Sequence, residues 1–435
     1  MHSIIVHPAA SLQGTLVLPG DKSISHRAVI FSSLAEGTTR LRNLLEGDDV
    51  LCTIDCFRAM GVPIEKEGEE WVVKGVGLKG LRAPQKVLYC GNSGTTLRLL
   101  LGVLAAQPFE ARLTGDASLN KRPVKRVTDP LSQMGAQFSV EGEGSDKRIV
   151  CVKGGALRGI DYRSPVASAQ VKSAILLAGL WAQGGTSVTE PLVSRDHTER
   201  ILEAAGVSIQ RSGTKVSLRP PPQLKIPSTW TVPGDFSSAA FFLVGGCLVP
   251  ASEIYLEKVG LNPTRTGALD ILKAMGAKIS IEENERMGGE EIGTLKIQFS
   301  SLTGTNIEGA LIPRLIDEIP ILAVAAAKAK GRTEIRDAAE LKVKESDRIR
   351  ILGELLRQIG VSAQERPDGL LIEGPKAFRS AEVQSFGDHR MAMAMAIAAL
   401  VAEGPITIHD IDCVKTSFPS FWECLRKLGA SVTFL

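Results

Sequence analysis

The chain lacks an apolar run long enough to cross a membrane, and it has few aromatic side chains. The apolar stretches 174–182 and 392–402 fall well short of the about 20 residues that a transmembrane helix needs. Aromatic residues make up 5% of the chain, too few for a base-stacking surface, and a net charge of +3 implies no polyanionic partner. We therefore expect a protein that binds neither a membrane nor nucleic acid.

The seven cysteines follow no disulfide or metal-site pattern. Their odd number and irregular spacing favour reduced thiols and a cytoplasmic location. Cys52 and Cys56 lie one helical turn apart, but no second pair of Cys or His completes a ligand set, so we expect no metal. The segment 1–5 has no basic region followed by a long apolar run, and we expect no signal peptide.

What the chain does contain is one pattern repeated six times. A Leu or Phe is followed by three residues, a Gly and then Ala or Val, with glycines spaced 74, 71, 70, 84 and 69 residues apart. Each copy predicts the last turn of an amphipathic helix, a left-handed glycine cap and a following strand. A unit of about 70 residues therefore builds the fold. The six glycines are Gly61, Gly135, Gly206, Gly276, Gly360 and Gly429.

Each unit also contains an apolar helix rich in small residues. A β-type segment follows it, then the amphipathic helix and two further strands, which gives the order βαβαββ. This order predicts an α/β fold in which the apolar helices are buried and the amphipathic helices face solvent. We expect the Glu-rich segment 282–291 to form a solvated hairpin. The expected apolar helices span 23–34, 95–106, 169–182, 237–247, 319–329 and 389–401.

The chain divides into halves at two copies of one tripeptide, Pro19-Gly20-Asp21 and Pro233-Gly234-Asp235. Each copy follows a short strand and precedes an apolar helix, and the second comes after a proline run at 220–222. Three of the glycine stops lie between the two copies and three lie after the second. We therefore expect two homologous domains joined by two strands that can act as hinges.

Polar residues gather where the helices begin. Free N–H groups at helix starts suit anions, but one helix dipole contributes only about 0.3–1 kcal/mol, so holding a phosphate dianion requires several ends together with Lys and Arg. The residues concerned include Lys22, Ser23, Arg27, Gly94, Arg98, Arg122, Ser168, Gln170, Lys172, Arg195, Arg265, Asp317, Glu318, Lys344, Glu345, Arg348, Asp388, His389, Arg390 and Lys415.

Several of these segments also have a purely structural interpretation. Segment 344–348 alone is typical of a surface capping box, and Asp317 and Glu318 suit any helix start. The loop 91–96 bares backbone N–H groups beside Arg98 but lacks the ending of a nucleotide P-loop. The motifs of serine hydrolases and zinc proteases do not occur.

Taken in order, these segments resemble the 5-enolpyruvylshikimate-3-phosphate synthase family over essentially the whole chain. The resemblance implies two domains of three βαβαββ units each, an inside-out α/β barrel architecture that closes over substrate. It also places residues 1–20 with the C-terminal domain, which gives domains of 21–233 and of 1–20 plus 234–435. The carrying motifs lie at 19–27, 91–98, 121–123, 168–170, 195–198, 316–318, 344–348, 388–390 and 415–416.

The resemblance further implies transfer of the enolpyruvyl group of phosphoenolpyruvate to the 5-hydroxyl of shikimate 3-phosphate, with release of phosphate and without a cofactor. Asp317 would accept the hydroxyl proton, and Glu345, with Lys22, would protonate the methylene carbon. We expect a cytoplasmic monomer and a glyphosate target. Shikimate 3-phosphate would be held by Lys22, Ser23, Arg27, Ser168, Gln170, Arg195, Asp317 and Lys344, and phosphoenolpyruvate by Lys22, Gly94, Arg122, Gln170, Arg348, His389, Arg390 and Lys415.

Two other functions compete with this interpretation. The related UDP-N-acetylglucosamine enolpyruvyl transferases carry a Cys in the loop before Arg-Pro-Val, whereas the loop 115–124 has none. A non-catalytic binder of phosphorylated metabolites or nucleic acid would have no use for Asp317 and Glu345. The chain also departs from the enterobacterial and plant pattern at Ser93, Thr96, Leu97, Leu99, Ala169 and Glu340.

Overall fold

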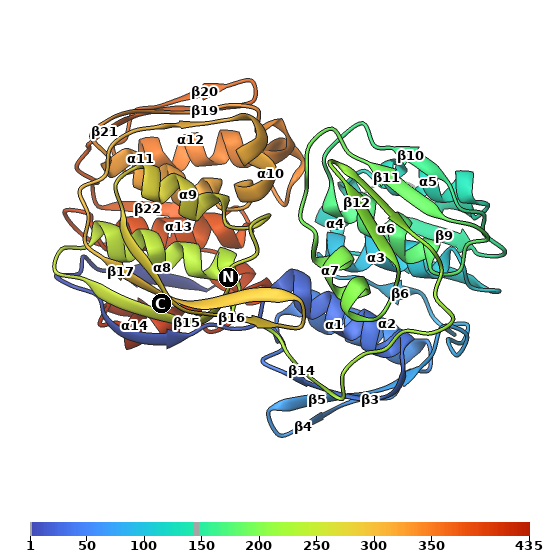
Figure 1. The fold of residues 1–435 in the computed structure, drawn as a ribbon. Helices are drawn as coiled ribbons and strands as arrows, with labels where there is room; N and C mark the ends of the chain where they lie inside the picture. The colour runs from blue at the N-terminus through green and yellow to red at the C-terminus, as the bar shows by residue number, and fades with distance from the viewer. Residues whose placement is uncertain (1, 143–147) are drawn as a thin grey trace. The chain divides into compact units, whose positions relative to one another are not determined.

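The computed structural model describes residues 2–142 and 148–435, and the chain divides into two compact units (Figure 1). We call residues 20–232 and 287–290 the N-terminal unit, and residues 1–19, 233–286 and 291–435 the C-terminal unit. In the described part of the chain, no helix combines the length and the apolar character needed to cross a membrane.

The described residues of the N-terminal unit form three four-stranded sheets around apolar helices (Figure 1). The apolar helices are α1 (Lys22–Leu34), α3 (Gly94–Leu104) and α6 (Ala169–Gly179), and the amphipathic ones are α2 (Asp48–Ala59), α5 (Lys125–Met134) and α7 (His197–Ala204), with a short α4 (Ala117–Lys121). The first sheet has the strand order β14 (Thr229–Thr231), β3 (Glu36–Arg42), β5 (Glu70–Val76) and β4 (Ile64–Glu67). The second has the order β6 (Leu88–Tyr89), β7 (Glu110–Thr114), β9 (Ile149–Lys153) and β8 (Gln137–Glu141). The third has the order β10 (Asp161–Arg163), β11 (Thr186–Thr189), β13 (Lys215–Leu218) and β12 (Ile209–Ser212).

The described residues of the C-terminal unit repeat this plan. Its apolar helices are α8 (Phe236–Leu248), α11 (Ile319–Lys328) and α13 (His389–Ala399), and its amphipathic ones are α9 (Gly267–Ala274), α12 (Arg348–Gln358) and α14 (Phe421–Lys427). Short turns form η1 (Gly309–Leu311), α10 (Ile312–Leu315), η2 (Ala339–Val343) and η3 (Ile411–Thr416). Its first sheet has the strand order β2 (Gln13–Val17), β15 (Glu253–Gly260), β17 (Glu290–Gln298) and β16 (Lys278–Met287). The second has the order β18 (Asn306–Ile307), β19 (Gly331–Ile335), β21 (Gly369–Gly374) and β20 (Ala363–Arg366). The third has the order β22 (Ala381–Gln384), β23 (Ile406–His409), β1 (Ser3–Val6) and β24 (Val432–Phe434).

All six sheets share one topology, which confirms the expected βαβαββ unit. In each sheet the first two strands in this order are parallel, and the central pair is antiparallel. In four sheets an apolar helix joins the parallel pair, and in the other two the first strand is exchanged between the units: β2 leads through α1 to β3, and β14 leads through α8 to β15. Three strands lie far in the sequence from the rest of their sheets: β14 completes the first sheet of the N-terminal unit, and β1 and β2 complete two sheets of the C-terminal unit.

The repeated glycines have the left-handed conformation that their pattern predicts. Their φ angles lie between 83° and 119°. In every copy the residue after the glycine donates its N–H to the carbonyl of the Leu or Phe that opens the pattern, as Val207 does to Leu202 at 2.9 Å. This is the hydrogen bond of a Schellman cap, so the pattern marks where each amphipathic helix ends.

The apolar helices are buried, as expected, and pack on one another inside each unit. Helix α3 packs on α6, and α11 packs on both α8 and α13. Small residues allow this close approach: a Cβ atom on Gly102 of α3 would lie 2.3 Å from the carbonyl oxygen of Ala174 of α6. Because these helices fill the centre of each unit, their polar first turns stand out as exceptions.

The prediction of a solvated hairpin at 282–291 is partly wrong. Strands β16 and β17 form the hairpin, and the side chains of 282–286 are exposed. Glu290, however, is 2% exposed and its Oε1 atom lies 2.7 Å from Nδ1 of His197, at the start of α7. A partner 93 residues away in the sequence leaves no trace in the local charge pattern.

We predict that replacing Gly206 with Ala lowers the free energy of unfolding by about 1–2 kcal/mol, the cost of a left-handed L-residue. Gly206 has a φ of 83°, and a Cβ atom there would approach only Lys225 Cδ, at 4.0 Å, so strain alone acts. Urea unfolding measures the loss. Gly155→Ala is the matched control, because nothing lies within 4 Å of its Cβ position and its φ is not positive. Equal stability of the two variants would contradict the argument.

A second prediction concerns His26, which is fully buried on α1 with Nδ1 2.7 Å from Thr53 Oγ1. Burial, aided by the charges of Lys22 and Arg27, holds the pKa of His26 well below 6.5. As the pH falls, the unfolded chain binds a proton at this histidine before the folded chain does. The contribution of neutral His26 to the free energy of unfolding is therefore fully present above pH 6.5 and decreases below it, by up to about 1.4 kcal/mol per pH unit. Urea unfolding of wild type and His26→Gln should therefore show a stability difference that shrinks towards acid; a constant difference would refute the prediction.

Candidate active site

The N-terminal parts of α1, α6 and α7 meet around Arg27. Its Nε donates to Thr198 Oγ1 at 2.7 Å and its Nη2 to Ser173 Oγ at 2.8 Å, and these two hydroxyls lie 2.7 Å apart. Burial lowers the pKa of Arg27 to about 10, with Arg195 adding to the effect and Glu199 and Asp21 opposing it. A buried guanidinium of this kind is stabilised by an added anion.

Lys22 and Ser23 are the first two residues of α1. Asp21, which precedes them, caps the helix by accepting a hydrogen bond from the Ile24 N–H at 2.8 Å. The Lys22 ammonium lies 3.1 Å from Asp49 of α2, and both side chains are largely buried. Lys22 is therefore held by a carboxylate at the start of the neighbouring helix, on the first turn of α1 beside Ser23 and one turn before Arg27.

The loop that precedes α3 forms a cationic pocket of its own. Arg122 donates two hydrogen bonds to Asn92. Its Nη1 donates to the Asn92 carbonyl oxygen at 3.2 Å, and its Nη2 donates to Asn92 Oδ1 at 2.5 Å. Arg98 donates to the side-chain oxygen of Gln170, whose Nε2 donates to Thr95 at 3.0 Å. Two arginines and a helix start thus meet at one loop, which suits an anion.

Gly94 leaves room for two guanidinium groups at this loop. A Cβ atom on Gly94 would lie 2.7 Å from Nη1 of Arg98 and 3.4 Å from Nη1 of Arg122. Its φ is not positive, so a side chain here would displace these guanidinium groups rather than strain the backbone. The absence of a side chain lets both guanidinium groups approach the first backbone N–H groups of α3.

Ser168 and Arg195 lie on segments linked by one carboxylate. Ser168 caps α6, and its backbone N–H donates to Glu190 Oε1 at 2.8 Å. Ser194, the residue before Arg195, donates its hydroxyl to both oxygens of Glu190 at 2.7 and 2.8 Å. Glu190 therefore fixes the start of α6 and the segment that carries the half-buried Arg195.

In the C-terminal unit, Asp317 lies among three cations. Its Oδ1 atom is 3.3 Å from Lys344 Nζ and 3.5 Å from Arg348 Nη1, and its Oδ2 atom is 3.9 Å from Arg390 Nη2. Arg390 also donates to the Asp317 carbonyl oxygen at 2.9 Å. The side chain of Asp317 keeps 15% exposure, so it is accessible to a ligand.

Arg348 is the centre of this second cluster and is 1% exposed. It lies 2.7 Å from Glu345 and 2.8 Å from Asp388, which also caps α13 by accepting from the Arg390 N–H at 3.0 Å. Burial by itself lowers the pKa of Arg348, but Asp388, Glu345 and Asp317 outweigh it and the net pKa lies above its ordinary value. Arg348 and Asp388, whose own pKa is lowered against the effect of burial, chiefly by Arg348, are therefore both charged at neutral pH.

Two expected site residues stand apart from this cluster. Lys415, on η3, has a 63% exposed side chain and pairs with Asp412 at 3.0 Å. His389 begins α13 and is buried, next to Arg390 in the sequence. The structure therefore brings Asp317, Lys344, Glu345, Arg348 and Arg390 together, and leaves Lys415 at the surface.

Sequence reasoning gave no role to the buried charges behind each cluster. In the C-terminal unit, Arg265 donates to Ser237 Oγ at 2.6 Å, Ser237 donates to Glu318, and Arg390 Nη1 lies 3.8 Å from Glu318. In the N-terminal unit, Lys172 pairs with Glu190 and Glu199. The available signal was a charged residue within an apolar helix pattern, which demands a buried partner.

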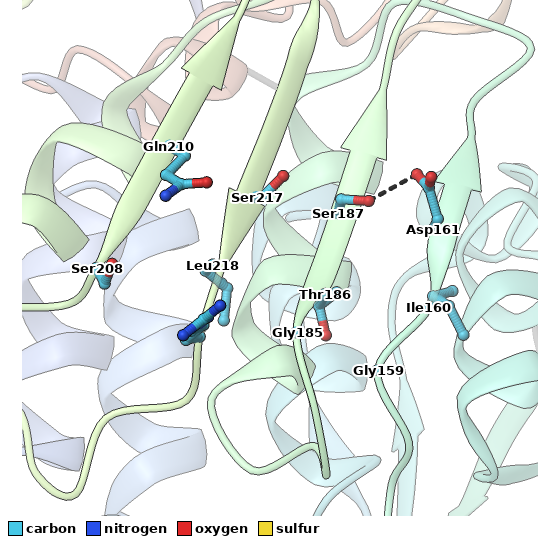
Figure 2. Close-up of a pocket in the computed structure, with 11 residues that line it drawn as sticks. Gly159, Ile160, Asp161, Gly185, Thr186, Ser187, Ser208, Gln210, Ser217 and Leu218 are labelled. Carbon is cyan, nitrogen blue, oxygen red and sulfur yellow. Dashed lines mark hydrogen bonds between the residues drawn. The ribbon is translucent and has the colours of Figure 1, made fainter.

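A separate hollow of about 320 Å³ lies on the sheet β10-β11-β13-β12, and none of the expected site residues lines it (Figure 2). Its polar groups include Ser187, whose hydroxyl donates to Asp161 at 2.6 Å. Within residues 2–142 and 148–435, no group of three or more His, Cys, Asp or Glu side chains is placed to hold a metal ion.

Known proteins resemble this chain over its whole length. The 3-phosphoshikimate 1-carboxyvinyltransferase of Desulforamulus reducens is 52% identical over 427 residues, which cover 98% of this chain and 99% of that protein. The solved EPSP synthase of Acinetobacter baumannii has 46% identity and a TM-score of 0.89, with 100% of both chains covered. The enolpyruvyl transferase NikO of Streptomyces tendae, at 18% identity and a TM-score of 0.79 over 100% of this chain and 99% of its own, shares the fold.

A family model agrees with the repeat topology and with these relatives. It is described as EPSP synthase (3-phosphoshikimate 1-carboxyvinyltransferase), and it matches residues 6–425. The match takes in five of the six repeated glycines and both polar clusters, and it ends within helix α14 of the sixth repeat. The chain belongs to the EPSP synthase family.

Proposed function

We propose that this chain transfers the enolpyruvyl group of phosphoenolpyruvate to the 5-hydroxyl of shikimate 3-phosphate and releases phosphate. The observation that carries the proposal is the cluster around Arg348. It holds two carboxylates, Asp317 and Glu345, beside the cations Lys344 and Arg390. A reaction that both removes and delivers a proton while handling anions needs this set.

Shikimate 3-phosphate is assigned to the residues around Arg27. Arg27 and Arg195 would bind the phosphate, and the lowered pKa of Arg27 supports an anion there because a bound anion stabilises the charged form against burial. The hydroxyls of Ser23 and Ser168 supply neutral donors at the starts of α1 and α6. Lys344 and Asp317 are assigned to the ring hydroxyl that reacts.

Phosphoenolpyruvate is assigned to the remaining cations. Arg122 and the loop at Gly94 supply a bare helix start with guanidinium groups, and Arg348 and Arg390 supply two more. Lys22 and Gln170 would contact both substrates. His389 and Lys415 complete the assignment, and Lys415, now paired with Asp412 at the surface, would have to exchange that partner for the substrate.

The chemistry then divides between the two carboxylates. Asp317 takes the proton of the 5-hydroxyl as its oxygen bonds to C2 of phosphoenolpyruvate, and Glu345, with Lys22, gives a proton to the methylene carbon. The resulting tetrahedral intermediate loses a methyl proton and its phosphate, which restores the enol ether. Before substrate binds, Arg348 pairs with Glu345; an anionic substrate that engages Arg348 releases Glu345 to carry a proton.

Three further assignments belong to this proposal. The two homologous domains would be 21–233 and 1–20 plus 234–435, with the hinges at the two Pro-Gly-Asp tripeptides. Asp21 and Asp235 of these tripeptides cap α1 and α8 through their side chains, so each hinge leads directly into a central helix. The enzyme would act as a cytoplasmic monomer.

The first test is the reaction itself. Purified protein should release phosphate only when phosphoenolpyruvate and shikimate 3-phosphate are both present, measured by a coupled phosphate assay. The folded state is checked by circular dichroism. Folded protein that releases no phosphate above background with both substrates would refute the proposed reaction.

The second test removes each carboxylate. Asp317→Asn and Glu345→Gln should each lower kcat by about 10²–10⁴-fold, the usual contribution of a general base or acid, with much smaller losses in substrate affinity. Asp270→Asn and Glu354→Gln are matched controls, because both carboxylates form exposed ion pairs in the same unit, with Arg314 and Arg350. Wild-type turnover in either site variant would remove that residue from the mechanism.

A further inference from the structure

Lys172 is a charged residue in the buried part of an apolar helix. It lies on α6, its side chain is 2% exposed, and its Nζ atom lies 2.8 Å from Glu190 and 2.8 Å from Glu199. Glu190 follows β11 and Glu199 lies on α7, so the three charges join three separate elements of one repeat. The side chains of both glutamates are at most 2% exposed.

The cluster holds the backbone of two segments that carry proposed ligands of shikimate 3-phosphate. Glu190 accepts from the Ser168 N–H and from the Ser194 hydroxyl, and Lys172 donates to the Ser194 carbonyl oxygen at 3.4 Å. Ser168 is itself one of those ligands, and Ser194 directly precedes Arg195. Their positions therefore depend on the same carboxylate and ammonium.

The third ligand, Arg27, is held by the sequence neighbours of this cluster. Ser173 follows Lys172 and accepts from Arg27 Nη2, and Thr198 precedes Glu199 and accepts from Arg27 Nε. Arg27, Ser168 and Arg195 thus share one buried support, although they lie on three separate segments of the chain. The Lys172 ammonium is already held by Glu190, Glu199 and the Ser194 carbonyl oxygen, so its role is to position these residues.

Stability alone does not account for this arrangement. Burying three charges has a large desolvation penalty, and well-packed apolar residues of similar size often serve stability equally well. The cluster also holds one more carboxylate than ammonium groups. Burial raises the pKa of Glu199, and the charge of Lys172 opposes this shift. The pKa of Lys172 is also raised, because the two glutamates outweigh the effect of its burial.

We propose that Lys172 is a positioning residue which, through Glu190 and Glu199, sets the relative positions of Ser168, Arg195 and Arg27 for shikimate 3-phosphate. The proposal rests on the function proposed above. It predicts that neutralising the cluster weakens the binding of this substrate specifically, because Arg122, a proposed ligand of phosphoenolpyruvate, is held by Asn92 instead.

The main test uses a neutral cluster of similar shape, Lys172→Met with Glu190→Gln and Glu199→Gln. Titration calorimetry should show Kd for shikimate 3-phosphate raised by about tenfold or more, as expected when binding groups shift by a fraction of an ångström. KM for shikimate 3-phosphate should rise in parallel, while KM for phosphoenolpyruvate stays within about twofold. An unchanged Kd in the folded triple variant would overturn the proposal.

A smaller change guards against a triple variant that does not fold. Ser194→Ala leaves all three charges in place and removes only the hydroxyl that links Glu190 to the segment before Arg195. It should raise Kd for shikimate 3-phosphate severalfold with a melting temperature close to wild type. Wild-type affinity in Ser194→Ala would overturn the proposal even if the triple variant could not be purified.

The matched control is Glu203→Gln on the same helix α7, because Glu203 forms an exposed ion pair with Arg211 outside the cluster. It should bind shikimate 3-phosphate like wild type, and a loss as large as that of the triple variant would contradict the role given to the buried cluster. Wild-type protein that neither binds this substrate nor turns it over would instead refute the proposed function, so the two failures are distinguishable.

Discussion

The close packing of apolar helices at the centre of each unit is the constraint on which the rest of the structure depends. Helix α3 approaches α6 so closely that Gly102 has no room for a side chain against the Ala174 carbonyl. Helices packed in this way present their first turns together, as the contacts of Arg27 with Ser173 and of Arg390 with the Asp317 carbonyl show. Several sets of unpaired N–H groups therefore gather in one region of each unit, where an anion can satisfy them.

The two units use this shared geometry for different chemistry. In the N-terminal unit the helix starts carry Arg27, Arg98 and a glycine loop, an arrangement that suits anions. In the C-terminal unit they carry Asp317 and Asp388, with Arg348 buried between carboxylates. Burial disfavours the charged form of each of these groups and their mutual attraction favours it, and the raised pKa of Arg348 shows that the attraction outweighs the burial there.

Much of the fold could be predicted because its signals are local. A Schellman cap depends on a glycine and on the residue four positions before it, so all six copies could be recognised in the sequence. The helix starts were equally legible, and most of the expected site residues lie on them. The buried partners were not: Glu290 pairs with a histidine 93 residues away, and Glu190 and Glu199 lie 18 and 27 residues from Lys172. Such pairs depend on tertiary packing, which no periodicity encodes.

Both units bury a charge network directly behind the residues proposed to bind substrate. Lys172 with its two glutamates lies behind Ser168 and Arg195, and Arg265 with Ser237 and Glu318 lies behind Arg390. Buried ion pairs contribute little net stability, but the two charged groups have few alternative positions. If one group moves away, the other is left buried and unpaired in a medium of low polarity. A site that must orient two anions before chemistry gains more from fixed geometry than from a more stable core. The location of these networks, under the binding residues of each unit, follows from that requirement.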